Sequence, residues 1–251
     1  MYNTKQSKKG FKSKLYTITT DDMYTLLNNT KGVDQVIVIL ACFMGLRAGE
    51  IIHSNKNWLH VKDSESKYHK VDHIAIPEAG TMRCDCIECR KRAYKDLLKE
   101  IYGKNHSKKW HAKKQKRFYK LNTSGKIDKI FEKHKVVPMW RPKTPAGSRG
   151  IPFIEKKTIP ILIDFFNSEQ KVSFSRIYSW NRLQKLGWKH LDKKISAHSL
   201  RASFATMLRN HGVNIFAIKT TLGHSGIEVT DRYVESGKET AMSSIKQAYK
   251  L

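Results

Sequence analysis

Side chains that can bind a phosphate group or carry a proton gather in a few short boxes of this sequence. His198 and Arg201 stand three residues apart at the expected start of a helix, so they share one face beside N–H groups that favour an anion. His224 lies in a glycine-bounded turn, and Tyr233 follows it by nine residues. A phenol, with an ordinary pKa of about 10, needs cationic neighbours or a base to act as a nucleophile at neutral pH.

Two further cations and one carboxylate extend this set. Arg47 lies near the end of a long apolar stretch with Glu50 three residues later, and Lys143 lies near the tip of a Pro/Gly/Ser turn. Each of these side chains alone has an ordinary explanation, as an ion-pair partner or a solvated group. Together, two guanidiniums, two imidazoles, one ammonium and one phenol, without a carboxylate pair to hold Mg²⁺, predict metal-free phosphoryl transfer.

The charge of the chain indicates the partner. Its 251 residues include 48 Lys and Arg against 22 Asp and Glu, a formal net charge of +26. Nucleic acid is the expected polyanion, with an acidic membrane surface as the alternative. No apolar run approaches the roughly 20 residues of a membrane span, and no signal-peptide pattern opens the chain. The sequence therefore predicts a soluble, cytoplasmic, nucleic-acid-binding protein.

The elements that must hold these side chains are mostly helical. Thr19, Ser173 or Ser175, and Ser196 are expected helix N-caps, and residues 33–54 read as one long, buried helix. The stretches "WLHV" and "HIAI" alternate as short strands do, and residues 136–154 read as two strands around a turn. We expect an α+β fold, mainly helical, with a small antiparallel sheet or β-hairpin.

The basic, aromatic-rich stretch at residues 106–122 has two interpretations. It is either a solvated, partly disordered loop or a loop that follows DNA, with Lys and Arg on phosphates. Ser225 and Glu228 have the spacing of a capping box, so a short helix is expected to begin there and to carry Tyr233.

Four boxes resemble, in order, the motifs of the tyrosine recombinase (integrase) family: "GLRAGEI", "PKTPAGSRGIPF", "AHSLRASFATML" and "LGHSGIEVTDRYV". The match spans roughly residues 15–240, and the H-x-L-R box followed by L-G-H and a later tyrosine is highly specific. Within the family, the region from residue 142 onward most resembles archaeal integrases, including those of viruses and plasmids. The resemblance implies a site-specific DNA recombinase that integrates or excises a mobile element or a virus genome.

The resemblance also implies a role for each matched side chain. Tyr233 attacks the scissile phosphate, which gives a 3′-phosphotyrosyl link and a free 5′-hydroxyl. Arg47 and Arg201 clamp the non-bridging oxygens, and Lys143 protonates the leaving 5′ oxygen. His198 acts as general base or proton relay for the phenol.

The remaining matched residues and the partners follow in the same way. His224 donates a hydrogen bond to the phosphate, and Glu50 supports the first arginine or the histidine. Strand exchange then needs neither ATP nor metal, because the phosphotyrosine conserves the bond energy. The implied partner is double-stranded DNA carrying the recombination sites, held by a homotetramer, and Gly237 is a plausible hinge for exchange of the C-terminal segment between subunits.

The resemblance sets the expected domain boundaries. Residues 1–14 form a basic flexible arm, and residues 15–251 form the catalytic domain with an insertion at about 57–135. The N-terminal DNA-clamping domain of the family is expected to be absent. DNA affinity then comes from the remaining basic surface or from an accessory DNA-binding protein.

The expected insertion contains a cysteine cluster. Cys84, Cys86 and Cys89 supply three thiolates, whereas a closed structural zinc site has four ligands. The cluster is therefore either a zinc site or a group of ordinary reduced thiols, and no catalytic metal is expected. The fourth zinc ligand has four candidates, His60, His69, His73 and His106.

Two other functions compete with a recombinase. A type IB topoisomerase shares the nucleophile and the phosphate clamp, but relaxes supercoils without pairing two DNA sites. A non-catalytic DNA-binding protein with a zinc module would not need Tyr233 beside the clamp. Cleavage through Tyr233 and pairing of two sites distinguish the three.

Overall fold

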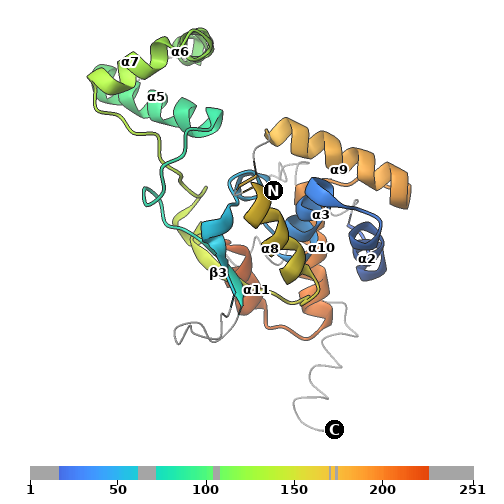
Figure 1. The fold of residues 1–251 in the computed structure, drawn as a ribbon. Coiled ribbons are helices and arrows are strands. Elements are labelled where there is room, and N and C mark those ends of the chain that lie inside the picture. Colours follow the sequence, from blue (N-terminus) through green and yellow to red (C-terminus); the bar gives the residue numbers. More distant parts are fainter. Residues whose placement is uncertain (1–16, 62–71, 104–107, 170, 173–174, 226–251) are drawn as a thin grey trace, which may run out of the picture. The chain divides into compact units, whose positions relative to one another are not determined.

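The computed structural model describes residues 17–61, 72–103, 108–169, 171–172 and 175–225 (Figure 1). The chain divides into two compact units: residues 1–76 together with 146–251 form the larger unit, and residues 77–145 form the smaller unit. The expected basic arm, Tyr233 with its expected helix, and the C-terminal segment lie outside the described residues.

The larger unit is mainly helical, with short strands. Its helices are α2 (Thr20–Asn28), α3 (Gly32–Val38), the π-helix η1 (Ile39–Phe43), α4 (Ala48–Ile51), the 3-10 helix η2 (Lys56–Trp58), α8 (Thr158–Glu169), α9 (Arg176–Leu191), α10 (Ala197–Asn210) and α11 (Ile215–Leu222). Its strands are β1 (Leu59–His60), β2 (His73–Ile76) and β3 (Arg149–Pro152). A further 3-10 turn, η3 (Pro145–Gly147), lies at the boundary with the smaller unit. None of the described helices is both long enough and apolar enough to cross a membrane.

The core of the larger unit is built on the apolar run in α3 and η1, which packs against α10. Every residue from Val36 to Met44 is at most 1% exposed, which explains why this stretch is apolar on all sides. Cys42 lies in it as a small core residue. The prediction of one continuous helix over 33–54 is wrong, because a left-handed Gly45 (φ +59°) ends it. Arg47 therefore begins the next helix, α4, instead of ending the buried one.

The expected caps are confirmed. Thr19 and Asp22 form a capping box at α2, Ser175 caps α9, and Ser196 with Ser199 forms a capping box at α10. Each side chain accepts a hydrogen bond from an N–H group that the first helical turn leaves unpaired. Gly223 ends α11 in the left-handed conformation, which glycine adopts readily.

The small antiparallel sheet has the order β1-β2-β3. Ile74 of β2 pairs with Leu59 on one side and Ile151 on the other, and Ile76 pairs with Arg149. The prediction of a hairpin within residues 136–154 is wrong. Strand β3 does not pair with the segment just before the turn; it pairs with β2, which lies more than 70 residues earlier. The segment around Met139 instead forms a bridge with Arg83 in the smaller unit.

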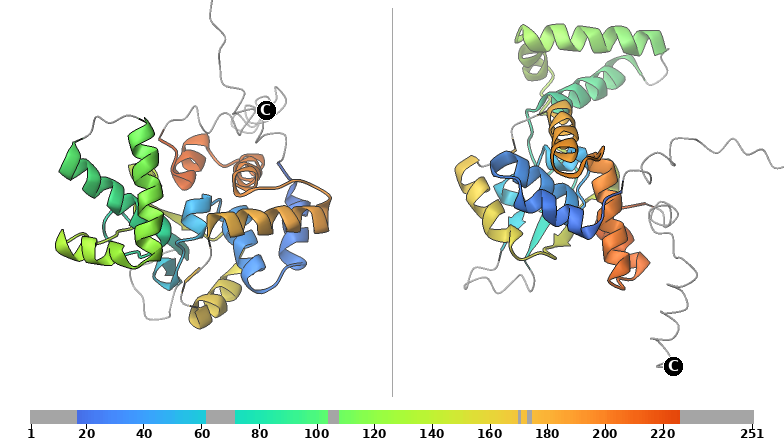
Figure 2. Two further views of the ribbon diagram at one scale, coloured as in Figure 1. Left: turned by 90° about the horizontal axis from the view of Figure 1, so that it is seen from above. Right: turned by 90° about the vertical axis from the view of Figure 1, so that its right-hand side faces the viewer.

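The smaller unit consists of α5 (Ile87–Tyr102), α6 (Lys108–Thr123) and α7 (Lys126–Lys133), which group together in both views of Figure 2. Tyr94, Phe118 and Phe131, one from each helix, share a core of their own. Backbone hydrogen bonds join the first and last segments of the unit: the N–H of Gly80 donates to the carbonyl of Trp140, and the N–H of Cys84 donates to the carbonyl of Pro138. Residues 106–122, expected as a loop, therefore mostly form helix α6. The smaller unit covers residues 77–145, whereas the expected insertion covered about 57–135. The bounds differ at the start because β1 and β2 belong to the larger unit.

Gly45 is predicted to be irreplaceable in the core. A Cβ atom there would lie 2.5 Å from Phe204 and 3.0 Å from Leu222, in a left-handed conformation. Backbone strain and overpacking together predict that Gly45→Ala lowers the free energy of unfolding by about 2–5 kcal/mol. The matched control is Gly49→Ala, since a Cβ at Gly49 meets nothing within 4 Å. Urea unfolding of both variants checks this, and equal effects would contradict it.

Candidate active site

Arg47 and Glu50 are brought together by the start of helix α4. Arg47 is the N-cap residue, and its backbone N–H donates to Glu50 Oε2 at 2.8 Å. Its Nη1 donates to Glu50 Oε1, also at 2.8 Å. The first turn of α4 therefore fixes the arginine and the carboxylate as a pair, and Glu50 is only 2% exposed.

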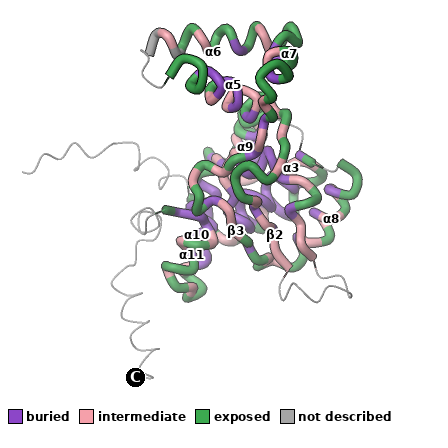
Figure 3. Tube along the Cα trace, turned by 90° about the vertical axis from the view of Figure 1, so that its left-hand side faces the viewer, coloured by how far each residue is buried: buried purple, intermediate pink, exposed green. Residues whose placement is uncertain are grey.

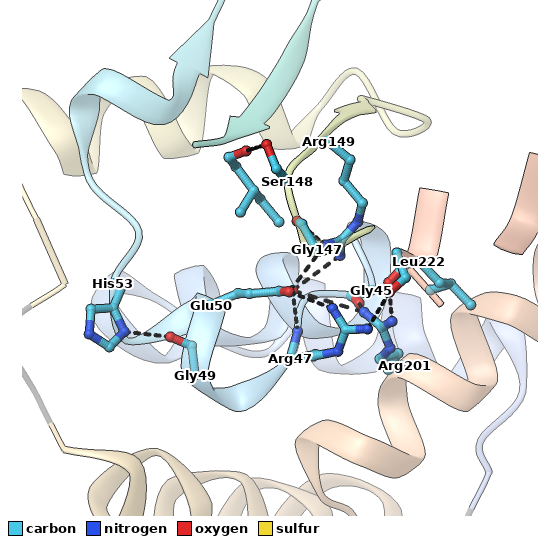
Figure 4. A network of polar contacts seen from close by, with 12 residues as sticks. Gly45, Arg47, Gly49, Glu50, His53, Gly147, Ser148, Arg149, Arg201 and Leu222 are labelled. Atoms are coloured by element: carbon cyan, nitrogen blue, oxygen red, sulfur yellow. Dashed lines mark hydrogen bonds and ion pairs between the residues drawn. The ribbon is translucent and has the colours of Figure 1, made fainter. Parts of the chain in front are cut away.

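Two more arginines reach the same carboxylate (Figure 4). Arg149, at the start of β3, donates from Nη1 to Oε1 and from Nη2 to Oε2 of Glu50, both at 3.1 Å. Arg201 Nη1 lies 3.9 Å from Glu50 Oε2. Both arginine side chains are nearly as buried as Glu50 itself, whereas the Arg47 side chain is 21% exposed.

The same three guanidiniums also hold the C-terminal end of helix α11. Arg149 Nε donates to the carbonyl of Thr221 at 2.5 Å, Arg201 Nη2 donates to the carbonyl of Leu222, and Arg47 Nη2 donates to the carbonyl of Gly223 at 2.5 Å. The last carbonyls of a helix have no partner within it and carry partial negative charge. Three successive carbonyls are thus each satisfied by a different arginine.

The electrostatics of this cluster favour an added anion. Burial alone would raise the pKa of Glu50, but the ion pair with Arg149, followed by the charges of Arg201 and Arg47, outweighs burial and lowers this pKa. Glu50 is therefore ionised at neutral pH. Three guanidiniums against one carboxylate leave an excess of two positive charges, which suits a phosphodiester whose charge increases in the transition state.

His224 follows directly after the end of α11. Its backbone N–H donates to the carbonyl of Lys219 at 3.1 Å, and the residue is 7% exposed. Burial first, and then the charges of Arg201, Arg47 and Arg149, lower the pKa of His224 to about 3. The imidazole is thus neutral at physiological pH, so one ring nitrogen carries a proton that it can donate in a hydrogen bond without adding charge.

The other predicted residues fall into three groups. His198 is an exposed residue in the first turn of α10, and its charge also lowers the pKa of His224. Lys143 is an exposed residue of the smaller unit. Tyr233 lies outside the described residues. The geometry thus unites Arg47, Glu50, Arg201 and His224.

Arg149 is the member of the cluster that the sequence did not reveal. It lies inside the box "PKTPAGSRGIPF", but an arginine at the edge of an expected strand resembles a solvated residue. A sequence signal for its burial did exist. Arg149 lies between a turn and the strand residue Ile151, which is buried, so its side chain lies close to the sheet surface. Its side chain is only 4% exposed.

The three clustered cysteines lie together in the smaller unit. The Sγ atoms of Cys84, Cys86 and Cys89 all lie within 4.8 Å of one another. Cys86 caps helix α5, and its sulfur accepts from the Cys89 N–H at 3.4 Å. Sulfurs on one tetrahedral zinc ion lie about 3.8 Å apart, given Zn–S bonds of about 2.3 Å, so this donor set fits the metal with little movement.

Of the four histidines expected as a fourth zinc ligand, two lie among the described residues. His60 and His73 face each other across β1 and β2 and stack with their ring centroids 5.0 Å apart. His69 and His106 lie outside the described residues.

The fold and the cluster together describe a mainly helical domain with a buried group of three arginines around one carboxylate. Glu50 is the carboxylate in the described part of this cluster, and it is paired with arginines. The phage integrase family model matches residues 16–240, and the chain therefore belongs to this family.

Curated relatives match part of the chain. Tyrosine recombinase XerD of Staphylococcus aureus is 34% identical over 99 residues, which cover 39% of this chain and 32% of that protein. XerD of Staphylococcus epidermidis is 36% identical over 86 residues, which cover 34% of this chain and 28% of that protein. The chain thus spans about a third of the length of the curated relatives it matches.

Solved structures share the fold. The crystal structure of XerA recombinase matches 92% of this chain and 62% of that one, with a TM-score of 0.52 and 14% identity. The Tn1549 transposon integrase, in complex with transposon right end DNA, matches 93% of this chain and 66% of that one, with a TM-score of 0.52 and 14% identity. The expected fold class, mainly helical with a small antiparallel sheet, is confirmed.

Arg149 is predicted to stabilise the cluster by neutralising Glu50. Arg149→Met removes two hydrogen bonds to buried Glu50, which keeps Arg47 as its partner, so the variant should lower the free energy of unfolding by about 1–3 kcal/mol at neutral pH. The pKa of Glu50 is lowered in the folded protein, so its pairing stabilises above its unfolded pKa of 4.5 and is lost as pH falls through the folded value. The deficit of the variant should therefore shrink in acid.

Chemical unfolding at a series of pH values measures this effect. The matched control is Arg182→Met, because Arg182 pairs with Asp34 at 2.5 Å but its side chain is 36% exposed. An exposed pair contributes about 0–1 kcal/mol. Equal losses in the two variants, or a deficit for Arg149→Met that does not change with pH, would count against the assignment.

Proposed function

We propose that this protein is a site-specific DNA recombinase that cuts and rejoins DNA through a 3′-phosphotyrosyl intermediate. The observation that supports it most is the set of three arginines on Glu50 and the end of α11, in a chain of the phage integrase family. The reaction serves integration or excision of a mobile element or virus genome. An origin among archaeal elements, and action on DNA in the cytoplasm, are further parts of this proposal.

The attack on DNA uses the phenol of Tyr233. Its oxygen bonds to the scissile phosphorus and its proton passes to a base, with His198 as acceptor or relay. The bond to the 5′ oxygen breaks, and Lys143 gives that oxygen a proton. Rejoining reverses these steps with a 5′-hydroxyl of the partner strand, so the number of phosphodiester bonds is conserved and neither ATP nor a catalytic metal is consumed.

The arginine cluster stabilises the charge that develops on the phosphate. Arg47 and Arg201 bind the non-bridging oxygens, and Arg47 is the more accessible of the two. His224 adds a neutral hydrogen-bond donor, consistent with its lowered pKa. Glu50 and Arg149 keep the guanidiniums in place before DNA arrives, so little reorganisation is needed during the reaction.

Double-stranded DNA with two recombination sites is the proposed substrate, and a homotetramer on the paired sites is the proposed assembly. The net charge of +26 supports the DNA partner. The Tn1549 integrase, a similar fold, was solved with transposon DNA.

Tyr233→Phe is predicted to abolish covalent capture of DNA. Wild-type protein incubated with a nicked suicide substrate should give a denaturation-resistant protein–DNA adduct, because release of the cut fragment prevents rejoining. The matched control is Tyr249→Phe, another tyrosine of the same segment, which should form the adduct as the wild type does.

An adduct that persists in Tyr233→Phe would refute the nucleophile. Two activity assays then distinguish the enzyme classes. Exchange between two paired sites is the expected result, whereas relaxation of a supercoiled plasmid without exchange would favour a type IB topoisomerase.

We also propose that Cys84, Cys86 and Cys89 hold a structural zinc ion in the smaller unit. The support is the mutual proximity of the three sulfurs and the position of Cys86 at the start of α5. The ion would join this helix start to the segment before it, which is hydrogen-bonded to Pro138 through Cys84. It has no part in strand transfer.

The zinc proposal predicts one bound zinc per chain. Elemental analysis of protein purified without chelator should find it, and Co²⁺ in its place should give the intense visible bands of a tetrahedral site. Cys86→Ser should lose the metal, while Cys42→Ala, which removes the buried cysteine of the other unit, should retain it. Absence of zinc in the wild type, or its retention in Cys86→Ser, would overturn the proposal.

A further inference from the structure

The smaller unit concentrates the positive charge of the chain. Its residues, 77–145, include 20 Lys and Arg against 7 Asp and Glu, a net charge of +13, which is half of the total of +26. A charge of this size raises electrostatic repulsion within a small folded unit, so it calls for a polyanionic partner.

Helix α6 presents this charge on one side. Its 16 residues include no Asp or Glu. Lys113, Lys116 and Lys120 are exposed and recur on successive turns of one face, which we call the α6 lysine face. The opposite face carries Phe118, which is fully buried in the core of the unit, and Trp110 packs against that core beside the first of these lysines. In Figure 3, most of the tube along α6 has the colour of exposed residues.

Three of the seven acidic residues of the unit form ion pairs with cations other than these lysines, and Asp85 pairs with Arg83 at 3.1 Å. Asp96 pairs with Arg141 at 2.8 Å and with Lys99 at 3.6 Å, and Asp128 pairs with Arg90 at 2.7 Å. Among the described residues, no ion pair connects a carboxylate to the α6 lysine face. The charge of this face is therefore not compensated within the unit.

Helix α7 shows what an ordinary solvated helix in the same unit looks like. It also carries three exposed lysines on one face, Lys126, Lys129 and Lys133. However, Asp128 and Glu132 alternate with them. The absence of acidic residues is thus a property of α6 and not of the unit as a whole.

We propose that the α6 lysine face binds the sugar–phosphate backbone of double-stranded DNA, which rests on the proposed function for its partner. The helical rise of about 1.5 Å per residue places Lys113 and Lys120 roughly 10 Å apart along the helix axis. One DNA strand carries about three phosphates over this length. Lysines act as point charges on phosphates, and phosphate contacts carry no direct sequence information, so the contact adds affinity without sequence specificity.

The test replaces Lys113, Lys116 and Lys120 together by Gln, which keeps helix propensity. The matched control replaces Lys126, Lys129 and Lys133 of α7 by Gln, with the same spacing, exposure and change in net charge. Binding to a fluorescent duplex of unrelated sequence is measured by anisotropy over a series of salt concentrations. Circular dichroism checks that both variants retain their helices.

Loss of three phosphate contacts should lower the slope of log K against log salt by about 2–3 and weaken binding on the order of a hundred-fold at 0.1 M salt. The α7 variant should bind nearly as the wild type does. Equal losses in both variants, or an unchanged slope for the α6 variant, would overturn the proposal. The adduct assay at low salt and saturating DNA separates this from the catalytic proposal: the α6 variant should still form the adduct, and absence of adduct in the wild type would concern Tyr233 chemistry alone.

Discussion

The candidate site depends on one interaction: three arginines that share a single carboxylate and bind three successive carbonyls at the C-terminal end of α11. Glu50 alone cannot neutralise Arg47, Arg149 and Arg201, and the helix end adds only partial negative charge. The guanidiniums are therefore bonded but not charge-balanced. This combination keeps a cation cluster in place inside the protein while an attraction for an added anion remains.

The same interaction joins four parts of the chain that are far apart in sequence. The turn at Gly45, the start of β3, the middle of α10 and the end of α11 meet through side-chain to main-chain hydrogen bonds. His224 follows this junction directly, so its neutral state is a consequence of the arginines beside it as well as of burial. The fold thus sets the protonation state of the histidine before any substrate binds.

The sequence revealed the parts of this site that local rules govern. Box spacing predicted Arg47, Glu50, Arg201 and His224, and cap chemistry predicted the helix starts. It did not reveal Arg149, whose role depends on a strand partner more than 70 residues away, nor helix α6, whose charge suggested a loop. In α6 the apolar residues Trp110, Phe118 and Leu121 recur on one helical face, and packing on the core outweighs repulsion among the lysines.

The pairing of Ile76 with Arg149 explains how a second unit can interrupt the catalytic sheet. Strands β2 and β3 pair directly with each other. The residues between them therefore form a separate core without changing the β2–β3 register that positions Arg149. The two units then carry positive charge in different ways. In the larger unit the arginines of the cluster are largely buried and bonded to one carboxylate, whereas in the smaller unit Lys113, Lys116 and Lys120 of α6 are exposed. Buried charge suits chemistry at one atom, because a surrounding of low polarity strengthens the electrostatic interaction. Exposed charge suits DNA affinity, because the release of counterions from DNA provides the binding free energy.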